Sequence, residues 1–243
     1  MFINRLFAAV LHVLWPTSCP VCGRLGEVLC TDCAASLFLL SPLPRCLRCG
    51  GMFPCLRHPG APRIRSASIY NGKIKSVILA LKYGGFRTVG QRLGMAMAPL
   101  WERPDADLLL PVPLHRGSSR GYNQALEIAR GLGRGWGMET LDAAQWARRV
   151  PRRAGLSQEE RRALAHDAFV IPSRLRGLRV ALVDDVCTTG TTLTRLAAAC
   201  ENAGVSVAGA YTAAGVVERL KNGVPCSDNI PSERSVPGGD RKF

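Results

Sequence analysis

The sequence lacks any apolar run of the roughly 18 to 20 residues that a membrane-spanning helix needs. Aromatic side chains are also scarce, at 6% of the chain. At the same time, 47% of the residues are hydrophobic and 21% are charged, which is typical neither of a disordered nor of a fibrous chain. Over 243 residues this composition predicts a soluble protein with one buried core, or one core and a small module.

Negative charge is scarce as well, and so is lysine. The chain has 18 Asp and Glu against 32 Lys and Arg, of which only 5 are Lys, so its net charge is +14. Residues 1–103 alone hold 13 basic and 3 acidic side chains. Such an asymmetry indicates a polyanionic partner, either nucleic acid or a phosphorylated ligand, and the alternative is an arginine-rich solvated surface.

The N-terminus lacks the small-residue cleavage site of a secretory signal peptide. We therefore expect Met1 to Trp15 to form an amphipathic helix that packs on the body of the protein. The cysteines are not spread through the chain as in a secreted disulfide scaffold, because seven of the ten fall between residues 19 and 55. Their paired spacing favours metal binding, and reduced cysteines imply the cytoplasm.

Four evenly built pairs of soft donors dominate this segment. They are Cys19 and Cys22, Cys30 and Cys33, Cys46 and Cys49, and Cys55 and His58. Two pairs complete a tetrahedron suited to structural zinc, so the count allows one site of four cysteines and one of three cysteines and a histidine. Sequential pairing is the simplest arrangement, while interleaved pairing or a degenerate second site stays open. Gly23 and Gly50 follow second cysteines, where a knuckle turn often needs a positive φ.

Three regions differ in composition. We expect a helix and a cysteine-rich module over residues 1–65, an α/β domain over residues 66–216 and a polar, disordered tail over residues 217–243. Apolar spacing in the middle region predicts strands at 107–112, 179–183 and 205–212, and helices at 74–81, 122–132 and 193–203. Alternating strands and helices favour a mostly parallel sheet that binds its ligand at the carboxyl ends of the strands.

The most informative stretch is the end of the strand that begins at Arg179. It carries two adjacent acids, Asp184 and Asp185, and then the run Thr188, Thr189, Gly190, Thr191, Thr192 before a helix. Amides at a helix N-terminus and Thr hydroxyls form a nest for a phosphate dianion, and a glycine lets the backbone approach it. Two carboxylates beside a phosphate site suit ribose hydroxyls or Mg²⁺, so the stretch predicts binding of ribose and phosphate together.

This stretch resembles the phosphoribosyl-diphosphate signature of class I phosphoribosyltransferases. Together with the upstream cysteine pairs, the chain resembles the ComF family, which includes the GntX-like proteins. Further similarity lies in the segments Ala80-Leu81-Lys82-Tyr83, Pro111-Val112-Pro113-Leu114 and Arg120-Gly121-Tyr122-Asn123-Gln124-Ala125. A basic loop around residues 155–169 is also similar, but it departs from the family pattern at two positions.

The resemblance implies a type I phosphoribosyltransferase fold with a small N-terminal zinc-ribbon-like module. It implies that Asp184 and Asp185 contact the ribose hydroxyls as the catalytic acids and that Thr188 to Thr192 hold the 5′-phosphate. Lys82, and either Arg116 or Arg120 after the predicted strand at 107–112, would contact the remainder of a phosphoribosyl diphosphate bound with Mg²⁺. Tyr122 and Asn123 would either face this ligand or pack their helix.

For function, the resemblance implies a cytoplasmic protein that supports DNA uptake in natural transformation, or growth on DNA. Incoming single-stranded DNA or a helicase of the uptake machinery would then be its partner. The alternative is an active transferase of nucleotide salvage, which releases pyrophosphate as a nitrogen nucleophile attacks the ribose.

Overall fold

The computed structural model describes residues 17–115, 117–118, 120–147 and 168–217. The predicted N-terminal helix, Arg116, most of the basic loop and all but the first residue of the predicted tail lie outside these residues. None of the described helices combines the length and the apolar character that crossing a bilayer requires.

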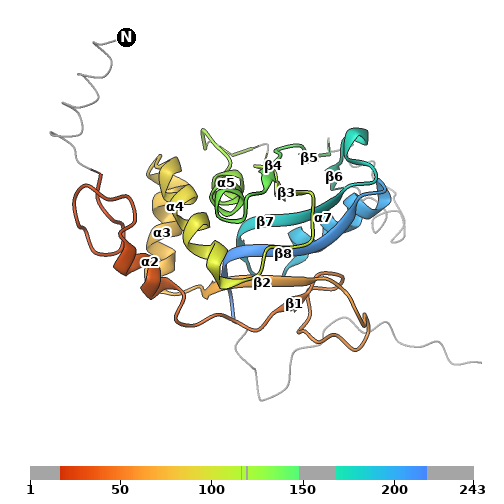
Figure 1. The fold of residues 1–243 in the computed structure, drawn as a ribbon, viewed down its shortest axis with the longest axis horizontal. Helices are drawn as coiled ribbons and strands as arrows, with labels where there is room; N and C mark the ends of the chain where they lie inside the picture. The colour runs from red at the N-terminus through yellow and green to blue at the C-terminus, as the bar shows by residue number, and fades with distance from the viewer. Residues whose placement is uncertain (1–16, 116, 119, 148–167, 218–243) are drawn as a thin grey trace, which may run out of the picture.

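A six-stranded sheet forms the centre of the protein, with the strand order β1-β2-β8-β7-β3-β4 (Figure 1). Every neighbouring pair is parallel except β1 and β2. The strands are β1 (Arg45–Cys46), β2 (Arg63–Ile69), β3 (Leu108–Pro111), β4 (Glu139–Thr140), β7 (Arg179–Cys187) and β8 (Ser206–Gly215). A separate pair of short antiparallel strands, β5 (Gln145–Trp146) and β6 (Phe169–Val170), lies outside this sheet.

Helices cover both faces of the sheet. One face packs against α3 (Gly72–Tyr83), α4 (Arg87–Met97) and α5 (Gln124–Trp136), and the other packs against α7 (Thr191–Asn202). Short helical pieces complete the described chain, namely α2 (Thr31–Leu37), η1 (Ala98–Leu100) and η2 (Ser173–Leu175). The predicted α/β class, with a mostly parallel sheet between helices, is confirmed.

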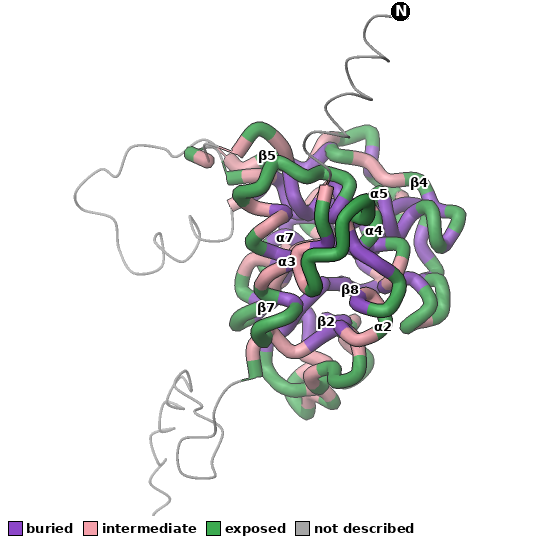
Figure 2. The backbone as a smooth tube through the Cα atoms, turned by 90° about the vertical axis from the view of Figure 1, so that its left-hand side faces the viewer, coloured by how far each residue is buried: buried purple, intermediate pink, exposed green. Residues whose placement is uncertain are grey.

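Strand β7 shows why the sheet is buried on both faces. Ala181 and Val183 belong to the core under α3, α4 and α5, while Val180 and Leu182 belong to the core under α7. Alternate side chains of a strand point to opposite faces, so a continuous apolar run suits a strand covered on both sides. Figure 2 shows the buried positions concentrated in the interior of the molecule.

Two differences from the predicted elements matter for the site. Strand β7 continues to Cys187 instead of ending at Val183, because Asp184 and Val186 stay paired with β8. The two acids therefore lie within the strand and not beyond it. In addition, β2 begins at Arg63, so the predicted domain boundary between residues 65 and 66 falls within a strand of the sheet.

Helix α4 was not among the predicted helices, because Gly90 and Gly94 dilute its apolar pattern. The structure explains these glycines. A Cβ on Gly94 would lie 2.1 Å from the Ile128 carbonyl oxygen, and one on Gly131 would lie 2.1 Å from the Gln91 carbonyl oxygen. The backbones of α4 and α5 therefore touch directly.

We expect Gly94→Ala to destabilise the protein, although alanine is the better helix former. The added methyl group meets backbone atoms, which no rotamer change can move away, so we expect a loss of about 1 to 3 kcal/mol in unfolding free energy. Gly72→Ala, in α3 with open space around the new Cβ, is the control and should be neutral or stabilising. Urea denaturation measures both, and equal stability of the two variants would contradict the proposed backbone contact.

Candidate functional site

The four donor pairs assemble into two groups in the sequential order that the spacing favoured. Cys19, Cys22, Cys30 and Cys33 form the first group, and Cys46, Cys49, Cys55 and His58 form the second. Within each group the candidate ligand atoms lie within 4.8 Å of one another. We call them the first and the second centre.

The interatomic distances suit a tetrahedral zinc ion. The Sγ atoms of Cys22 and Cys30 are 3.7 Å apart, as are those of Cys49 and Cys55. A Zn–S bond of about 2.3 Å implies a tetrahedral S–S edge of about 3.8 Å. His58 Nδ1 lies 3.5 Å from Cys55 Sγ, which fits the shorter Zn–N bond. Each centre therefore offers four protein donors, and a tetrahedral ion bound by all four would have no coordination position left for a substrate.

Local backbone geometry supports both centres. Gly23 and Gly50 adopt φ values of +75° and +73°, as predicted for knuckle turns. Although burial raises the pKa of Cys19, backbone hydrogen bonds from Cys30, Cys22 and Val21 outweigh that effect and lower it to about 6. Amide groups that point at a thiolate favour the deprotonated form that binds metal.

The two centres lie on opposite sides of the sheet. Cys19, Cys30 and Cys33 belong to the core under α3, α4 and α5, whereas Leu47, inside the second centre's first pair, belongs to the core under α7. Figure 1 shows the first segment beside α2 and the second beyond β1.

The candidate ligand site lies where β3 and β7 run side by side. Helix α5 follows β3 toward β4 on one face, and α7 follows β7 toward β8 on the other face. The chain thus leaves two adjacent parallel strands in opposite directions, and such a switch point opens a crevice at their carboxyl ends. The loop after β3 and the Thr-rich loop after β7 both begin at this edge.

The Thr-rich loop leads directly into the N-terminus of α7. Gly190 is the N-cap residue, with φ +80°, and has no side chain to cap the helix, while the Thr191 amide donates to the Thr189 hydroxyl at 3.4 Å. Thr188, Thr189 and Thr191 are exposed, and the Oγ1 atoms of Thr189 and Thr191 are 2.8 Å apart. The amides of the first helical turn lack intrahelical acceptors and carry the positive end of the helix dipole. This arrangement can bind a phosphate group.

The two acids sit behind this loop, near a lysine from another element. Lys82, in the last turn of α3, forms an ion pair with Asp185 in which Nζ and Oδ2 are 2.7 Å apart. Asp184 accepts a hydrogen bond from the Asp185 amide at 2.8 Å. Burial, and then the adjacent Asp185 carboxylate, raise the pKa of Asp184 to about 8. The structure therefore brings Lys82 to the predicted acid pair.

Tyr122 and Asn123 hold the site together from the start of α5. The Tyr122 hydroxyl donates to the Leu81 carbonyl, next to Lys82, and the Asn123 side chain donates to the Val112 carbonyl at 3.0 Å. Asn123 Oδ1 also caps α5 by accepting from the Ala125 amide at 3.1 Å. Of the two roles that the sequence left open, the structure shows helix packing.

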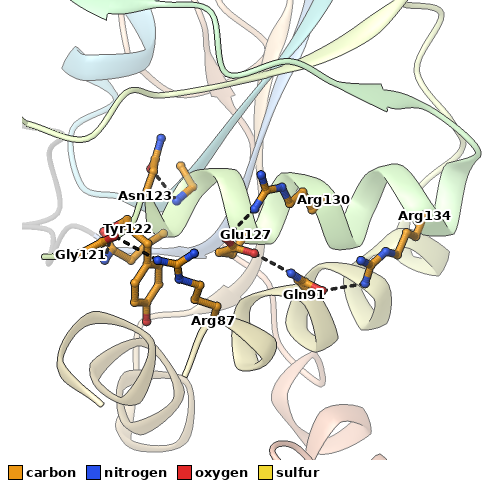
Figure 3. Close-up of polar contacts among 10 residues, drawn as sticks. Arg87, Gln91, Gly121, Tyr122, Asn123, Glu127, Arg130 and Arg134 are labelled. Carbon is orange, nitrogen blue, oxygen red and sulfur yellow. Dashed lines mark hydrogen bonds and ion pairs between the residues drawn. The ribbon is translucent and has the colours of Figure 1, made fainter. Parts of the chain in front are cut away.

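A polar network continues from this point along α5 (Figure 3). The buried Glu127 accepts from Gln91 at 2.6 Å and from Arg130 at 2.7 Å, and Gln91 accepts in turn from Arg134. Arg87 donates to the Gly121 carbonyl at 3.2 Å and lies over the Tyr122 ring. The network ties α4 to α5 and fixes the segment that carries Tyr122.

Three further polar or thiol side chains near the site have packing partners. His115 is exposed and packs edge-on against Trp146, with ring centroids 5.4 Å apart, as befits a loop histidine. Cys187 is buried in the core under α7. Arg120 lies over the Tyr83 ring, 5.5 Å from its centroid, and donates to Gln124 at 3.3 Å.

The chain is similar to known proteins that are named for DNA utilization or for competence. The chain is 28% identical over 196 residues to the DNA utilization protein YhgH of Salmonella typhimurium (strain LT2), a match that covers 74% of this chain and 82% of that protein. It is 35% identical over 105 residues to competence protein F of Haemophilus influenzae (strain Rd), which covers 41% of this chain and 46% of that protein. No protein-family model matches the chain.

Among solved structures, the allosteric regulatory enzyme of purine biosynthesis is similar to this chain. The match has a TM-score of 0.38 and 25% identity, and it covers 50% of this chain and 25% of that enzyme. The chain thus spans a quarter of that structure's length.

We expect the purified chain to bind two zinc ions. Cys22 and Cys49 are the exposed thiols of the first and second centres, so Cys22→Ser and Cys49→Ser should each lower the zinc content by one ion with little loss of core packing. Inductively coupled plasma mass spectrometry after removal of loose metal measures the content. A single ion in the wild type, or loss of both ions in either variant, would contradict two independent centres.

The raised pKa of Asp184 predicts a pH-dependent stability. Its pKa rises from 3.8 to about 8 on folding, so the native state holds a proton that the unfolded state releases, and this contribution to stability is lost as pH rises toward 8. Asp184→Asn should therefore gain stability over the wild type by up to about 1.4 kcal/mol per pH unit between pH 6 and 8, and no more above it. Urea denaturation of both proteins across this range tests the trend, and a difference independent of pH would refute it.

Proposed function

We propose that this chain, which is similar to competence protein F and the DNA utilization protein YhgH, belongs with the ComF family, binds phosphoribosyl diphosphate with Mg²⁺ and supports DNA uptake or DNA utilization. The proposed ligand site lies at the carboxyl ends of β3 and β7. Residues 66–216 form the phosphoribosyltransferase-like domain of this proposal, and residues 1–65 contribute the zinc module.

One observation carries the proposal, namely the meeting of a helix N-terminus whose cap residue is a glycine, an acid pair and a lysine at one switch point. A phosphate dianion suits the exposed Thr hydroxyls and first-turn amides of α7. A nucleotide phosphate site alone would not need the acids behind the loop. Ribose hydroxyls donate to carboxylates, and Mg²⁺ prefers oxygen ligands, so a ribose phosphate with Mg²⁺ satisfies both halves of the site.

The charges of the site agree with this assignment. Lys82 forms an ion pair with Asp185, and burial together with the adjacent carboxylate raises the pKa of Asp184 to about 8. A ligand that brings hydroxyl donors or a cation to Asp184 favours its ionised form. Lys82 is then placed to attract the diphosphate, because its Nζ lies at the same edge of the sheet.

The contact with DNA rests on the names of the homologues and on charge. The first 103 residues carry a charge of +10, from 13 basic and 3 acidic side chains, and several of these arginines lie on the surface of the described chain, among them Arg24, Arg48 and Arg57. Incoming single-stranded DNA or a helicase of the uptake machinery is the partner that we propose for the exposed arginines of this half of the chain.

We expect calorimetric titration of the zinc-loaded chain with phosphoribosyl diphosphate and Mg²⁺ to show binding at one site. Replacing both Asp184 and Asp185 by Asn should weaken it by at least about tenfold, since each lost charged hydrogen bond contributes more than 1 kcal/mol.

Asp105→Asn provides the matched control for that titration. Asp105 is an exposed acid that pairs with Arg179 at the opposite end of β7, so its removal should leave the affinity unchanged. Circular dichroism verifies that each variant is folded. If the folded wild type does not bind, or if the double variant binds as well as the wild type, the proposed site is wrong.

A further inference from the structure

We propose that the second centre positions the Thr-rich loop, so that metal binding at Cys46, Cys49, Cys55 and His58 and phosphate binding at Thr188 to Thr192 strengthen each other. The inference rests on the proposed function for the identity of the phosphate ligand. Its structural basis does not depend on that ligand.

The knuckle turn of the second centre touches the loop backbone to backbone. Gly50 follows Cys49, and a Cβ placed on it would lie 2.4 Å from the Thr189 carbonyl oxygen. From the other side, a Cβ on Gly190 would lie 3.4 Å from the Gly50 Cα atom and 2.9 Å from Ile64 Cδ1. The turn and the loop therefore approach so closely that neither can move without moving the other.

Several contacts hold the knuckle in this place. The Gly50 amide donates to the Cys46 carbonyl and the Cys46 amide donates to the Gly51 carbonyl, both at 2.8 Å. Arg45 donates to the Gly50 carbonyl at 3.0 Å and to the Val216 carbonyl at 3.4 Å. Arg45 thus links the knuckle to the chain just beyond β8.

Helix α7 is tied to the same knuckle. Arg48, between the two cysteines of the turn, pairs with Glu201 near the end of α7, with Nη1 and Oε2 2.7 Å apart. Leu47, beside it, is 2% exposed and packs into the core under α7. The turn that binds metal is therefore anchored to the helix whose N-terminus forms the phosphate site.

The rest of the second centre has little apolar support of its own. Met52 is 57% exposed and Leu56 is 97% exposed, and Cys49 lies at the surface. A small segment without a core depends on its metal for a fixed conformation. Loss of the ion would release the Cys49 end of the turn. The Gly50 backbone, which contacts Thr189 and Gly190, would then no longer be fixed. Preorganised amides bind an anion more tightly than mobile ones, so phosphate affinity should fall.

The first centre supplies a natural comparison. Gly23 occupies the same position after Cys22 and has φ +75°, against +73° for Gly50. No atom lies within 4 Å of a Cβ placed on Gly23. An alanine at either position therefore suffers the same backbone strain, and only the alanine at position 50 meets the Thr-rich loop.

The first experiment compares Gly50→Ala with Gly23→Ala by calorimetric titration with phosphoribosyl diphosphate and Mg²⁺, after zinc content has been measured. We expect Gly50→Ala to keep two ions and to lose about tenfold or more in affinity, and Gly23→Ala to bind as the wild type does. Equal affinities of the two variants would overturn the inference. Absence of binding by the wild type would instead overturn the proposed function.

The second experiment removes the metal and needs no ligand. In Cys49→Ser, we expect the hydrogen-bonded amides at the start of α7, beginning with Thr194, which donates to the Gly190 carbonyl at 2.9 Å, to exchange with deuterium about tenfold faster or more than in the wild type, whereas in Cys22→Ser they should exchange at the wild-type rate. Unchanged exchange in Cys49→Ser would overturn the coupling whether or not the phosphate ligand has been identified.

Reciprocity gives a third readout on the wild type itself. If ligand and metal favour each other, saturating phosphoribosyl diphosphate and Mg²⁺ must raise the zinc affinity of the second centre. Competition with a chelator measures this affinity. The factor of increase must equal the factor by which zinc raises the affinity for the ligand. The first centre should show no such change. A ligand that binds without altering either zinc affinity contradicts the inference.

Discussion

Parallel pairing of β7 with β3 on one side and β8 on the other is the constraint on which the site depends. It brings the carboxyl ends of strands from distant parts of the sequence to one edge, and it sends their following helices to opposite faces. The Thr-rich loop, the acid pair and the loop after β3 are neighbours for this reason alone. Without this pairing, none of the motifs would lie close enough to share a ligand.

The site also contains features that lower the stability of the fold, and packing elsewhere in the protein compensates for this loss. Two adjacent carboxyl groups lie in a strand that is otherwise apolar, and the result is the raised pKa of Asp184 and the ion pair of Asp185 with Lys82. Helix α7 begins at a glycine with positive φ and without a side-chain cap. Such features cost stability, and they are typical of sites shaped by a ligand.

Much of this was predictable from the sequence where the signal was local. Cysteine spacing predicted both groups of metal ligands, and the apolar run before Asp184 predicted a buried strand, because each depends on residues close together in the chain. The extension of β7 to Cys187 was not predictable, since it follows from pairing with β8.

Contacts between distant segments could not be predicted from the sequence for the same reason. Lys82 was placed in the site only by resemblance, and nothing in the pattern around Gly50 indicates its contact with Thr189. The knuckle turn requires glycine at position 50 in any case, so the sequence gives no separate indication of its contact with Thr189. The glycines of α4 likewise weakened the helical pattern. Only the packing of α5 against them explains why these positions are glycine.

The most direct test of the central claim is a crystal structure of the zinc-loaded chain with phosphoribosyl diphosphate and Mg²⁺. The account predicts the 5′-phosphate over the amides at the start of α7, the ribose hydroxyls at Asp184 and Asp185, and the Gly50 turn still in contact with Thr189. A ligand bound away from the carboxyl ends of β3 and β7, or a crevice that stays empty at saturating ligand, would contradict it.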